Sequence, residues 1–297
     1  MLFLKSFCLP SRREEDGYLL SFPHQLEMSC YSMTEAYPFK IFPQKELCEI
    51  IFEPITVFYG GNGSGKSTLL NVISEKLEIS RSSLFNRTAH TEAYLQMCKY
   101  RLGMESKRVP NQSKKITSDD VFDFLLDVRA INEGIDRRRE ELFNEYYVTN
   151  ETPMPRFTSL EEHDEFKRCL EAKRTTKSAY VSRRVPKELT GKSNGESAFL
   201  YFTHKIEENA LYLLDEPENS LSPKLQREMA QFISDSARFY GCQFIISTHS
   251  PFLLGIKGAK IYDLDSVPTV PKKWYELENV REYQAFFEEN RNLFKQS

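Results

Sequence analysis

Apolar positions along this chain alternate between short continuous runs and helical spacings, which predicts an α/β fold. The continuous runs predict short buried strands, of the kind found in parallel sheets, near residues 55–58, 210–214, 243–247 and 260–264. Helical spacing over Gly65–Leu77 follows the first run, and helical spacing over Pro223–Phe239 separates the second from the third. This strand–helix–strand order predicts right-handed parallel units with helices packed on the sheet.

The first sixty residues are expected to form a β-rich lobe, with candidate strands at Met1–Leu9, Tyr18–Phe22 and Glu46–Phe58. Three aromatic residues in this region, Tyr37, Phe39 and Phe42, are candidates for stacking on a nucleotide base. In a β-rich lobe such residues more often fill the core, which is the favoured interpretation here.

The middle of the chain is predicted to be helical. Helical spacing covers Thr91–Leu102 and then a long segment from Asp119 to about Tyr147, and a capping box at Ser159–Glu162 predicts a further helix to about Thr175. The tail Tyr275–Phe294 is expected to be a last helix that docks on the core.

Composition describes an ordinary soluble protein, with 40% hydrophobic and 28% charged residues and a net charge of −3. The net charge argues against a globally basic nucleic-acid binder. Between Lys167 and Lys187, however, eight basic residues face one acid, Glu171. A solvated helix face is the favoured interpretation, and a surface for nucleotide or nucleic-acid phosphates is the alternative.

No apolar run approaches the roughly 20 residues of a membrane span, so membrane insertion is not expected. The six cysteines are scattered, without a C-x-x-C pair or an adjacent histidine. Such cysteines are typical of reduced thiols, which predicts a cytoplasmic location.

The stretch Gly60–Thr68 carries the pattern G-x-x-x-x-G-K-[ST] between a predicted strand and a predicted helix. Glycines let backbone N–H groups turn toward an anion, and the start of the helix favours negative charge. Lys66 is expected to reach the β- and γ-phosphates, and Ser67 to coordinate Mg²⁺. A glycine-rich turn without a ligand is the alternative, and the strand–loop–helix context disfavours it.

Two further predicted strands end in residues that could bind a metal or take part in catalysis. Asp215 and Glu216 follow the run Leu211–Leu214, where Asp215 is placed to bind Mg²⁺ and Glu216 to orient or deprotonate water. His249 follows the next strand, where its imidazole is expected to contact the γ-phosphate. Upstream, Ser193–Ser197 opens a helix, a pattern that a simple helix cap would also explain.

In this order, these motifs resemble the ABC-type ATPase head, in the SMC/RecF-like and OLD-like branch of small AAA family ATPases. The resemblance implies a P-loop NTPase fold with an N-terminal β-rich lobe and an inserted helical lobe. It implies one domain over residues 1–297, with a core lobe at about 1–84 and 191–297 and a helical lobe at about 85–190. It further implies ATP and Mg²⁺, with Ser67 and Asp215 as metal ligands and Lys66, Glu216 and His249 as catalytic residues. The implied nucleotide-binding residues are Gly60, Asn62, Gly63, Ser64, Gly65, Lys66, Ser67, Thr68, Ser193 and Gly195.

The family also implies that two heads sandwich two ATP molecules, with Ser193 and Gly195 of one copy touching the γ-phosphate held by the other. The segment Asn219–Ser222 would occupy the D-loop position in the dimer interface. The signature departs from the family pattern, since Lys192 and Asn194 replace its leading leucine and first glycine. No clear Q-loop glutamine is present; Thr117–Asp120 occupies the expected position, with Gln96 and Gln112 as weaker candidates.

Three functions remain open at this point. The first is an ATPase that powers or gates a protein partner or a nucleic-acid process through ATP-driven dimerisation. The second is a slow regulatory ATP switch that controls an effector such as a nuclease, which the degenerate signature fits. The third, the energising subunit of a membrane transporter, is disfavoured because it requires an obvious Q-loop.

Overall fold

The computed structural model describes residues 2–20, 36–83, 87–104, 106, 108–151, 153, 170–185 and 193–294. The chain divides into two compact units, and each is described by itself. The first unit contains Met1–Val121 and Asn194–Ser297, and the second contains Phe122–Ser193. Residues 87–104, which the sequence placed in the helical lobe, lie in the first unit.

The first unit is built on a seven-stranded sheet with the order β10-β9-β3-β8-β7-β6-β4. All neighbours in it are parallel except β10 and β9. Its three central strands, β3, β8 and β7, are buried throughout, as their continuous apolar runs predict. The strands span Ile55–Tyr59 (β3), Ser80–Arg81 (β4), Lys114–Thr117 (β6), Leu211–Asp215 (β7), Gln243–Ser247 (β8), Lys260–Asp263 (β9) and Pro271–Lys272 (β10).

An antiparallel three-stranded sheet, β2-β1-β5, belongs to the same unit. Its strands are β1 (Leu4–Cys8), β2 (Glu49–Ile51) and β5 (Lys99–Leu102). Together the two sheets confirm the predicted α/β P-loop head with an N-terminal β-rich lobe. The strand predicted at Tyr18–Phe22 is wrong for its described part, because Tyr18 and Leu19 end helix α1 (Arg12–Leu19). A capping box between Ser11 and Glu14 starts this helix.

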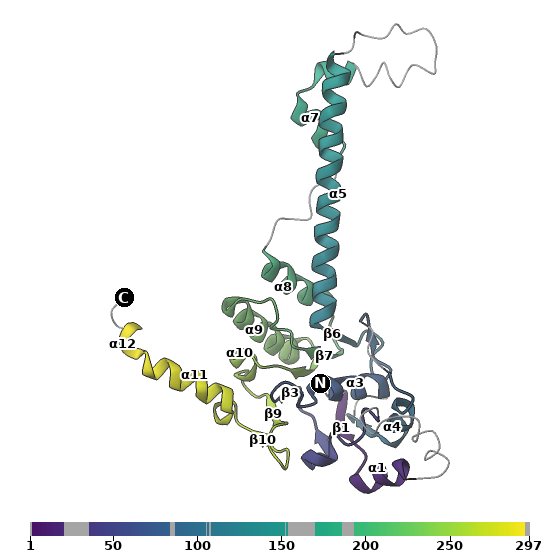
Figure 1. The fold of residues 1–297 in the computed structure, drawn as a ribbon, viewed down its shortest axis with the longest axis vertical. Coiled ribbons are helices and arrows are strands. Elements are labelled where there is room, and N and C mark those ends of the chain that lie inside the picture. The colour runs from purple at the N-terminus through teal and green to yellow at the C-terminus, as the bar shows by residue number, and fades with distance from the viewer. Residues whose placement is uncertain are drawn as a thin grey trace. The chain divides into compact units, whose positions relative to one another are not determined.

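Figure 1 shows the helices of the first unit, and the start of α9 has a clear local cause. Helix α9 begins where the hydroxyl of Ser222 accepts from the amide of Leu225 and Pro223 takes the first helical position. Helix α3 packs against β7 and β8, and α9 packs against β8 and α10. The remaining bounds are Lys66–Lys76 (α3), Thr91–Met97 (α4), Asn194–Lys205 (α8), Pro223–Phe239 (α9), Pro251–Leu254 (α10), Glu278–Glu289 (α11) and Arg291–Phe294 (α12), with 3₁₀ turns at Pro43–Lys45 (η2) and Trp274–Glu276 (η4).

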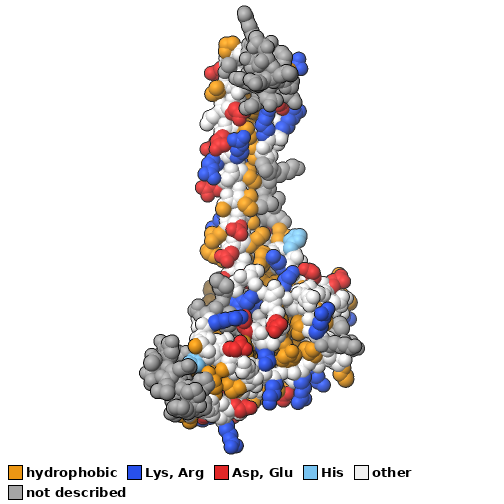
Figure 2. All heavy atoms as spheres, turned by 90° about the vertical axis from the view of Figure 1, so that its right-hand side faces the viewer, with side chains coloured by type: hydrophobic (Ala, Val, Ile, Leu, Met, Phe, Trp, Pro, Cys, Tyr) orange, Lys and Arg blue, Asp and Glu red, His pale blue; other side chains and the backbone are white. Residues whose placement is uncertain are grey.

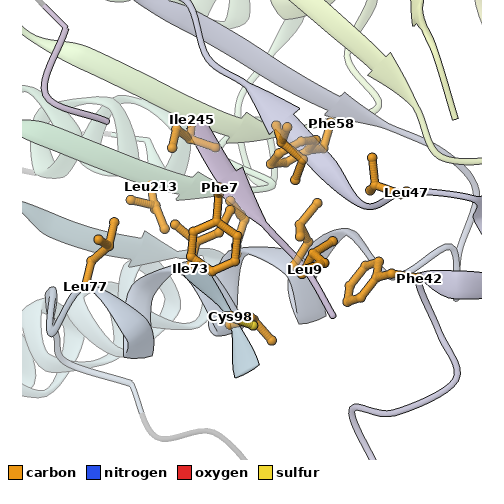
Figure 3. Packing of buried hydrophobic residues seen from close by; sticks show 14 of the residues in the cluster. Phe7, Leu9, Phe42, Leu47, Phe58, Ile73, Leu77, Cys98, Leu213 and Ile245 are labelled. Atoms are coloured by element: carbon orange, nitrogen blue, oxygen red, sulfur yellow. The ribbon is translucent and has the colours of Figure 1, made fainter. Parts of the chain in front are cut away.

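One apolar core connects the two sheets (Figure 3). Phe7 of β1 faces Leu213 of β7 and Ile73 of α3 in this cluster, and each is fully buried. Gln243 strengthens the junction, because its buried side chain accepts from the amides of Phe3 and Leu4 at 2.8 Å each. The C-terminal helix α11 contributes little to the core, since only Val280 on it is buried. The tail Tyr275–Phe294, expected to be one helix that docks on the core, instead forms η4, α11 and α12, with Val280 of α11 buried.

The second unit contains most of helix α5 (Ser118–Glu151) and the short helix α7 (Lys177–Ser182). A small cluster around Leu142, Tyr180 and Val181 holds the unit together. Acidic and basic side chains are interspersed along it (Figure 2). Arg184 pairs with Glu171 at 2.7 Å, and the Lys177 ammonium donates to the Tyr147 hydroxyl at 2.9 Å.

Two residues of the predicted basic stretch, Lys177 and Arg184, therefore make contacts within the second unit itself. Lys167, Arg168 and Lys187 of that stretch lie outside the described residues. A role in binding phosphates therefore stays a prediction. Among the helices that the structure describes, none is both long enough and apolar enough to cross a membrane.

Candidate functional site

The glycine loop connects the end of β3 to the start of α3 in a conformation that requires glycine. Gly63 and Gly65 have φ angles of 79° and 94°, which L side chains rarely adopt. A Cβ added to Gly65 would lie 3.1 Å from Cγ2 of Ile41 and 3.5 Å from Cε1 of Phe42. A Cβ at Gly60 would meet the Ser64 hydroxyl at 2.6 Å, too close for any side chain. The backbone thus forms a tight turn ahead of the helix start.

Phe42 supports this loop from the core rather than offering a surface. Phe42 is fully buried and Phe39 is 4% exposed. Phe39 stacks on Tyr18, with ring centroids 5.0 Å apart, and meets Tyr94 edge-on. This packing agrees with the interpretation of Phe39 and Phe42 as core residues.

Lys66 lies over its own loop. Its ammonium donates to the carbonyl oxygens of Gly60 at 2.7 Å and Gly61 at 3.1 Å. Burial lowers the pKa of Lys66, while the nearby carboxylates of Glu216, Asp265 and Asp215 act in the opposite direction. Asn62 is exposed in the loop, and Thr68 is half-buried in the first turn of α3. The Ser64 hydroxyl oxygen is buried and has no hydrogen-bond partner within the described chain.

The Asp215 carboxylate contacts two hydroxyl groups and one ammonium group, which come from three neighbouring elements. The hydroxyl of Ser67 donates to Asp215 Oδ1 at 3.0 Å, and the hydroxyl of Ser247 on β8 donates to the same oxygen. The ammonium of Lys115 on β6 lies 3.9 Å from Asp215 Oδ2. Burial lowers the pKa of Lys115 to about 8, partly offset by the charge of Asp215.

A small cavity of about 240 Å³ opens beside these groups. Ser67, Asp215 and Glu216 line it together with Thr117, Ser118 and Asp119. The segment assigned to the Q-loop position therefore lies at the cavity. Gln112 instead donates to the carbonyl of Asn209 at 3.1 Å, and Gln96 is exposed on α4, so neither is among the residues lining the cavity. A larger groove of about 1120 Å³ runs along α9 and α10, and the phosphate loop does not line it.

Glu216 and His249 lie next to each other at the ends of β7 and β8. The His249 Nε2 atom is 3.6 Å from Glu216 Oε1. Glu216 has a φ of 49°, and its amide donates to the carbonyl of Ser247 at 3.0 Å. Asn219 donates to Glu216 Oε2 at 3.2 Å. The parallel register of Asp215 with Ser247 explains why acids and histidine meet at the carboxyl edge of the sheet.

Sequence reasoning missed Glu218. Its Oε1 atom accepts from the amides of His249 at 2.6 Å and Ser250 at 3.2 Å. Burial raises the pKa of Glu218, while the hydrogen bonds to its carboxylate oppose that shift.

Sequence reasoning also missed Asp265, which follows β9. The amide of Gly61 donates to Asp265 Oδ2 at 2.6 Å. These two residues are 204 positions apart, and no local pattern marks Asp265 as a neighbour of the loop. The carboxylate fixes the first turn of the phosphate loop.

The signature residues fall on either side of the boundary between the units. Ser193 is the last residue of the second unit, and Gly195 lies in the first turn of α8. A Cβ on Gly195 would lie 3.0 Å from the carbonyl oxygen of Ser220 and 3.1 Å from Cδ1 of Leu225. Gly195 thus packs on the segment expected at the D-loop position.

The residues present suit a nucleotide with a divalent metal. A glycine turn with no room for a Cβ, a lysine and a helix start are features of phosphate cradles. Hydroxyl and carboxylate oxygens such as those of Ser67 and Asp215 are ligands that Mg²⁺ prefers. Within the described residues, no cluster of three or more His, Cys, Asp or Glu side chains forms a separate metal site.

Comparisons with known proteins point in the same direction. Residues 182–255 match the AAA_21 family model, described as "AAA domain, putative AbiEii toxin, Type IV TA system". This range contains Asp215, Glu216 and His249 as well as Ser193 and Gly195. No similar protein was found among curated proteins.

Several solved structures are similar at low identity. One is an Smc head bound to the C-winged helix domain of ScpA, with 17% identity over 77% of this chain and 94% of that chain and a TM-score of 0.39. Another, from Pyrococcus furiosus, is an Smc head domain with an extended coiled coil bound to the C-terminal domain of ScpA, with 15% identity over 82% and 95% and a TM-score of 0.37. A dimeric bacterial ABC transporter cassette shares 15% identity over 77% and 90%, with a TM-score of 0.34. Residues 182–255, which include the acidic end of β7 and the histidine after β8, are thus similar to an AAA domain.

Proposed function

We propose that the chain binds ATP together with Mg²⁺ and hydrolyses it to ADP and phosphate. The observation that carries the proposal is the arrangement around Asp215. Its carboxylate accepts from Ser67 of the phosphate loop at 3.0 Å, and the pair Glu216–His249, 3.6 Å apart, follows at the same edge of the sheet. This arrangement supports a single site for the phosphates, the metal and the attacking water.

The proposed roles follow from the chemistry of each group. The amides of Gly60, Asn62, Gly63, Ser64, Gly65, Ser67 and Thr68 and the ammonium of Lys66 bind the phosphates. Ser67 and Asp215 hold Mg²⁺, which neutralises charge on the phosphate oxygens when it is bound. Glu216 orients the attacking water and accepts its proton, and His249 contacts the terminal phosphate.

The proposal includes a second copy of the chain. Ser193 and Gly195 of that copy complete the site over the terminal phosphate, so that ATP binding closes a homodimer and hydrolysis opens it. Such a cycle in the cytoplasm serves to power or gate a protein partner, or a nucleic-acid process through the basic stretch 167–187. A slow regulatory switch that controls an effector such as a nuclease is the second candidate, favoured by the degenerate signature. A transporter subunit is the least supported.

Two variants test the proposal together. Glu216→Gln removes the base but leaves the phosphate loop intact, so we expect ATP binding, accumulation of dimer and loss of turnover by about 10²-fold or more. Lys66→Ala removes the cation of the loop, so we expect loss of nucleotide binding itself. The measurements are ATP binding by equilibrium titration, phosphate release, and mass by light scattering with and without ATP. Normal turnover in Glu216→Gln, or unchanged affinity in Lys66→Ala, would contradict the assigned roles.

A further inference from the structure

The backbone of His249 is held from both sides by side chains of other elements. Its N–H donates to Glu218 Oε1 at 2.6 Å, and its carbonyl accepts from Asn279 Nδ2 at 3.0 Å. Glu218 follows β7, and Asn279 lies in the first turn of α11. Two segments far apart in the sequence therefore meet on the backbone of one residue in the loop after β8.

We infer that Glu218 and Asn279 are positioning residues that hold His249 beside Glu216. The inference rests on the proposed ATPase function, in which His249 contacts the terminal phosphate. The imidazole is 3.6 Å from the Glu216 carboxylate, and a displacement of its backbone by about 1 Å would remove that approach.

Glu218 holds the loop after β8 through two successive amides. Its Oε1 atom accepts from the amides of His249 and Ser250. Such charge-assisted hydrogen bonds are shorter and stronger than neutral ones, so they fix the loop closely.

Asn279 ties the same loop to the phosphate loop. The amide of Asn279 donates to the hydroxyl of Tyr59 at 3.2 Å, while its side chain binds the carbonyl of His249. Tyr59 is the last residue of β3, directly before Gly60. The remainder of α11 is largely exposed, with only Val280 buried. The first turn of this helix is thus fixed at the site, which links the position of His249 to the strand that carries the loop.

The contact itself can be measured without any activity. The chain has five histidines, so ¹⁵N-histidine labelling reports at most five backbone amides, and the His249 amide is the one that disappears in His249→Gln. A short hydrogen bond to a carboxylate moves an amide proton downfield. We expect Glu218→Gln to shift this resonance upfield and Asn279→Ala to shift it as well. A His249 amide that stays in place in both variants would overturn the inference.

The functional consequence is tested by a double-mutant cycle. Glu218→Gln and Asn279→Ala should each lower the rate of ATP hydrolysis by about tenfold, with ATP affinity changed less than about twofold. In a His249→Ala background, neither change should reduce the rate further, because both act through His249. A further loss in that background would show an effect on the whole fold and contradict the inference.

Glu282→Gln provides a matched control. It makes the same chemical change on an exposed side chain of α11 and should leave both the amide resonance and the rate unchanged. A wild-type chain without ATPase activity would overturn the proposed function. The amide shifts would then still decide separately whether Glu218 and Asn279 hold His249.

Discussion

The hydroxyl of Ser67 donates to Oδ1 of Asp215 at 3.0 Å, joining residues that are 148 positions apart. Ser67 is in the first turn of α3, and Asp215 is the last residue of β7. Because α3 packs against β7, the glycine loop and the acidic end of β7 lie side by side.

Replacing Ser67 with alanine is expected to remove the advantage that Mg²⁺ gives to ATP binding. In the wild-type chain Mg²⁺ should tighten binding about tenfold or more, because on the proposed function Ser67 and Asp215 hold the metal against the phosphates. In Ser67→Ala, ATP should bind equally well with Mg²⁺ and with EDTA. Isothermal titration under both conditions measures this. Ser80→Ala, at an exposed serine on β4, is the control, and an undiminished Mg²⁺ effect in Ser67→Ala would rule out its role as a ligand.

Alanine at Gly65 is expected to destabilise the first unit by about 1–2 kcal/mol or more, since its φ of 94° is strained for any L side chain. The new Cβ would also press on Ile41 at 3.1 Å. Urea unfolding measures the loss, and ATP binding should weaken with it.

Gly17→Ala is the control, with an effect on stability of the opposite sign. No atom lies within 4 Å of a Cβ at Gly17 in α1, so alanine there should stabilise by up to about 1 kcal/mol. Equal effects of both changes would contradict the argument.

Gln243→Leu should cost about 3 kcal/mol or more, although leucine fits an apolar core. The change leaves the amides of Phe3 and Leu4 and the carbonyl of Leu4 without their side-chain partner. Hydrogen exchange at the two amides should accelerate together with the loss of stability in urea. Gln231→Leu, on the exposed face of α9, should change stability by less than about 0.5 kcal/mol. Similar losses in both variants would refute the bridging role of Gln243.

Glu15 is expected to make stability depend on pH between about 4.5 and 7. Its side chain is buried in α1, and burial raises its pKa to about 7, against the hydrogen bond from the amide of Lys40. A raised folded-state pKa means that the folded chain binds the proton more tightly than the unfolded chain. The stabilisation is therefore fully present below pH 4.5 and is lost as the pH rises through 7.

Unfolding in urea across this pH range measures the slope. Glu15→Gln remains neutral at every pH, so its stability should not show this decline. A wild-type chain and a Glu15→Gln variant with parallel pH profiles would contradict the assignment.

Much of the site could be predicted because it depends on local patterns. The runs that form β3, β7 and β8 are apolar throughout, and parallel neighbours place their carboxyl ends, and so Asp215 and His249, at one edge. Tyr18 shows the limit of that reasoning. The stretch Tyr18–Phe22 predicts a strand, whereas the capping box at Ser11 and Glu14 starts a helix that includes Tyr18.

The contacts of Glu218, Asp265 and Asn279 could not be predicted in the same way. Each depends on which backbone amide or carbonyl a side chain meets after the strands and α11 are in place. Asp265 reaches Gly61 across 204 positions, and Asn279 reaches His249 across 30. The spacing of residues within a motif does not determine such long-range contacts between a side chain and the backbone.

The position of Lys66 has a consequence for selectivity. Its ammonium has two carbonyl partners within its own loop, those of Gly60 and Gly61, so an incoming anion must compete with them. A singly charged ion that offers one weak contact gains little by this exchange. On the proposed function, a polyphosphate would replace both partners at once and would meet a loop that is already shaped, with less conformational freedom left to lose. An anion that binds Lys66 must therefore offset the loss of two hydrogen bonds, which would favour highly charged anions over singly charged ones.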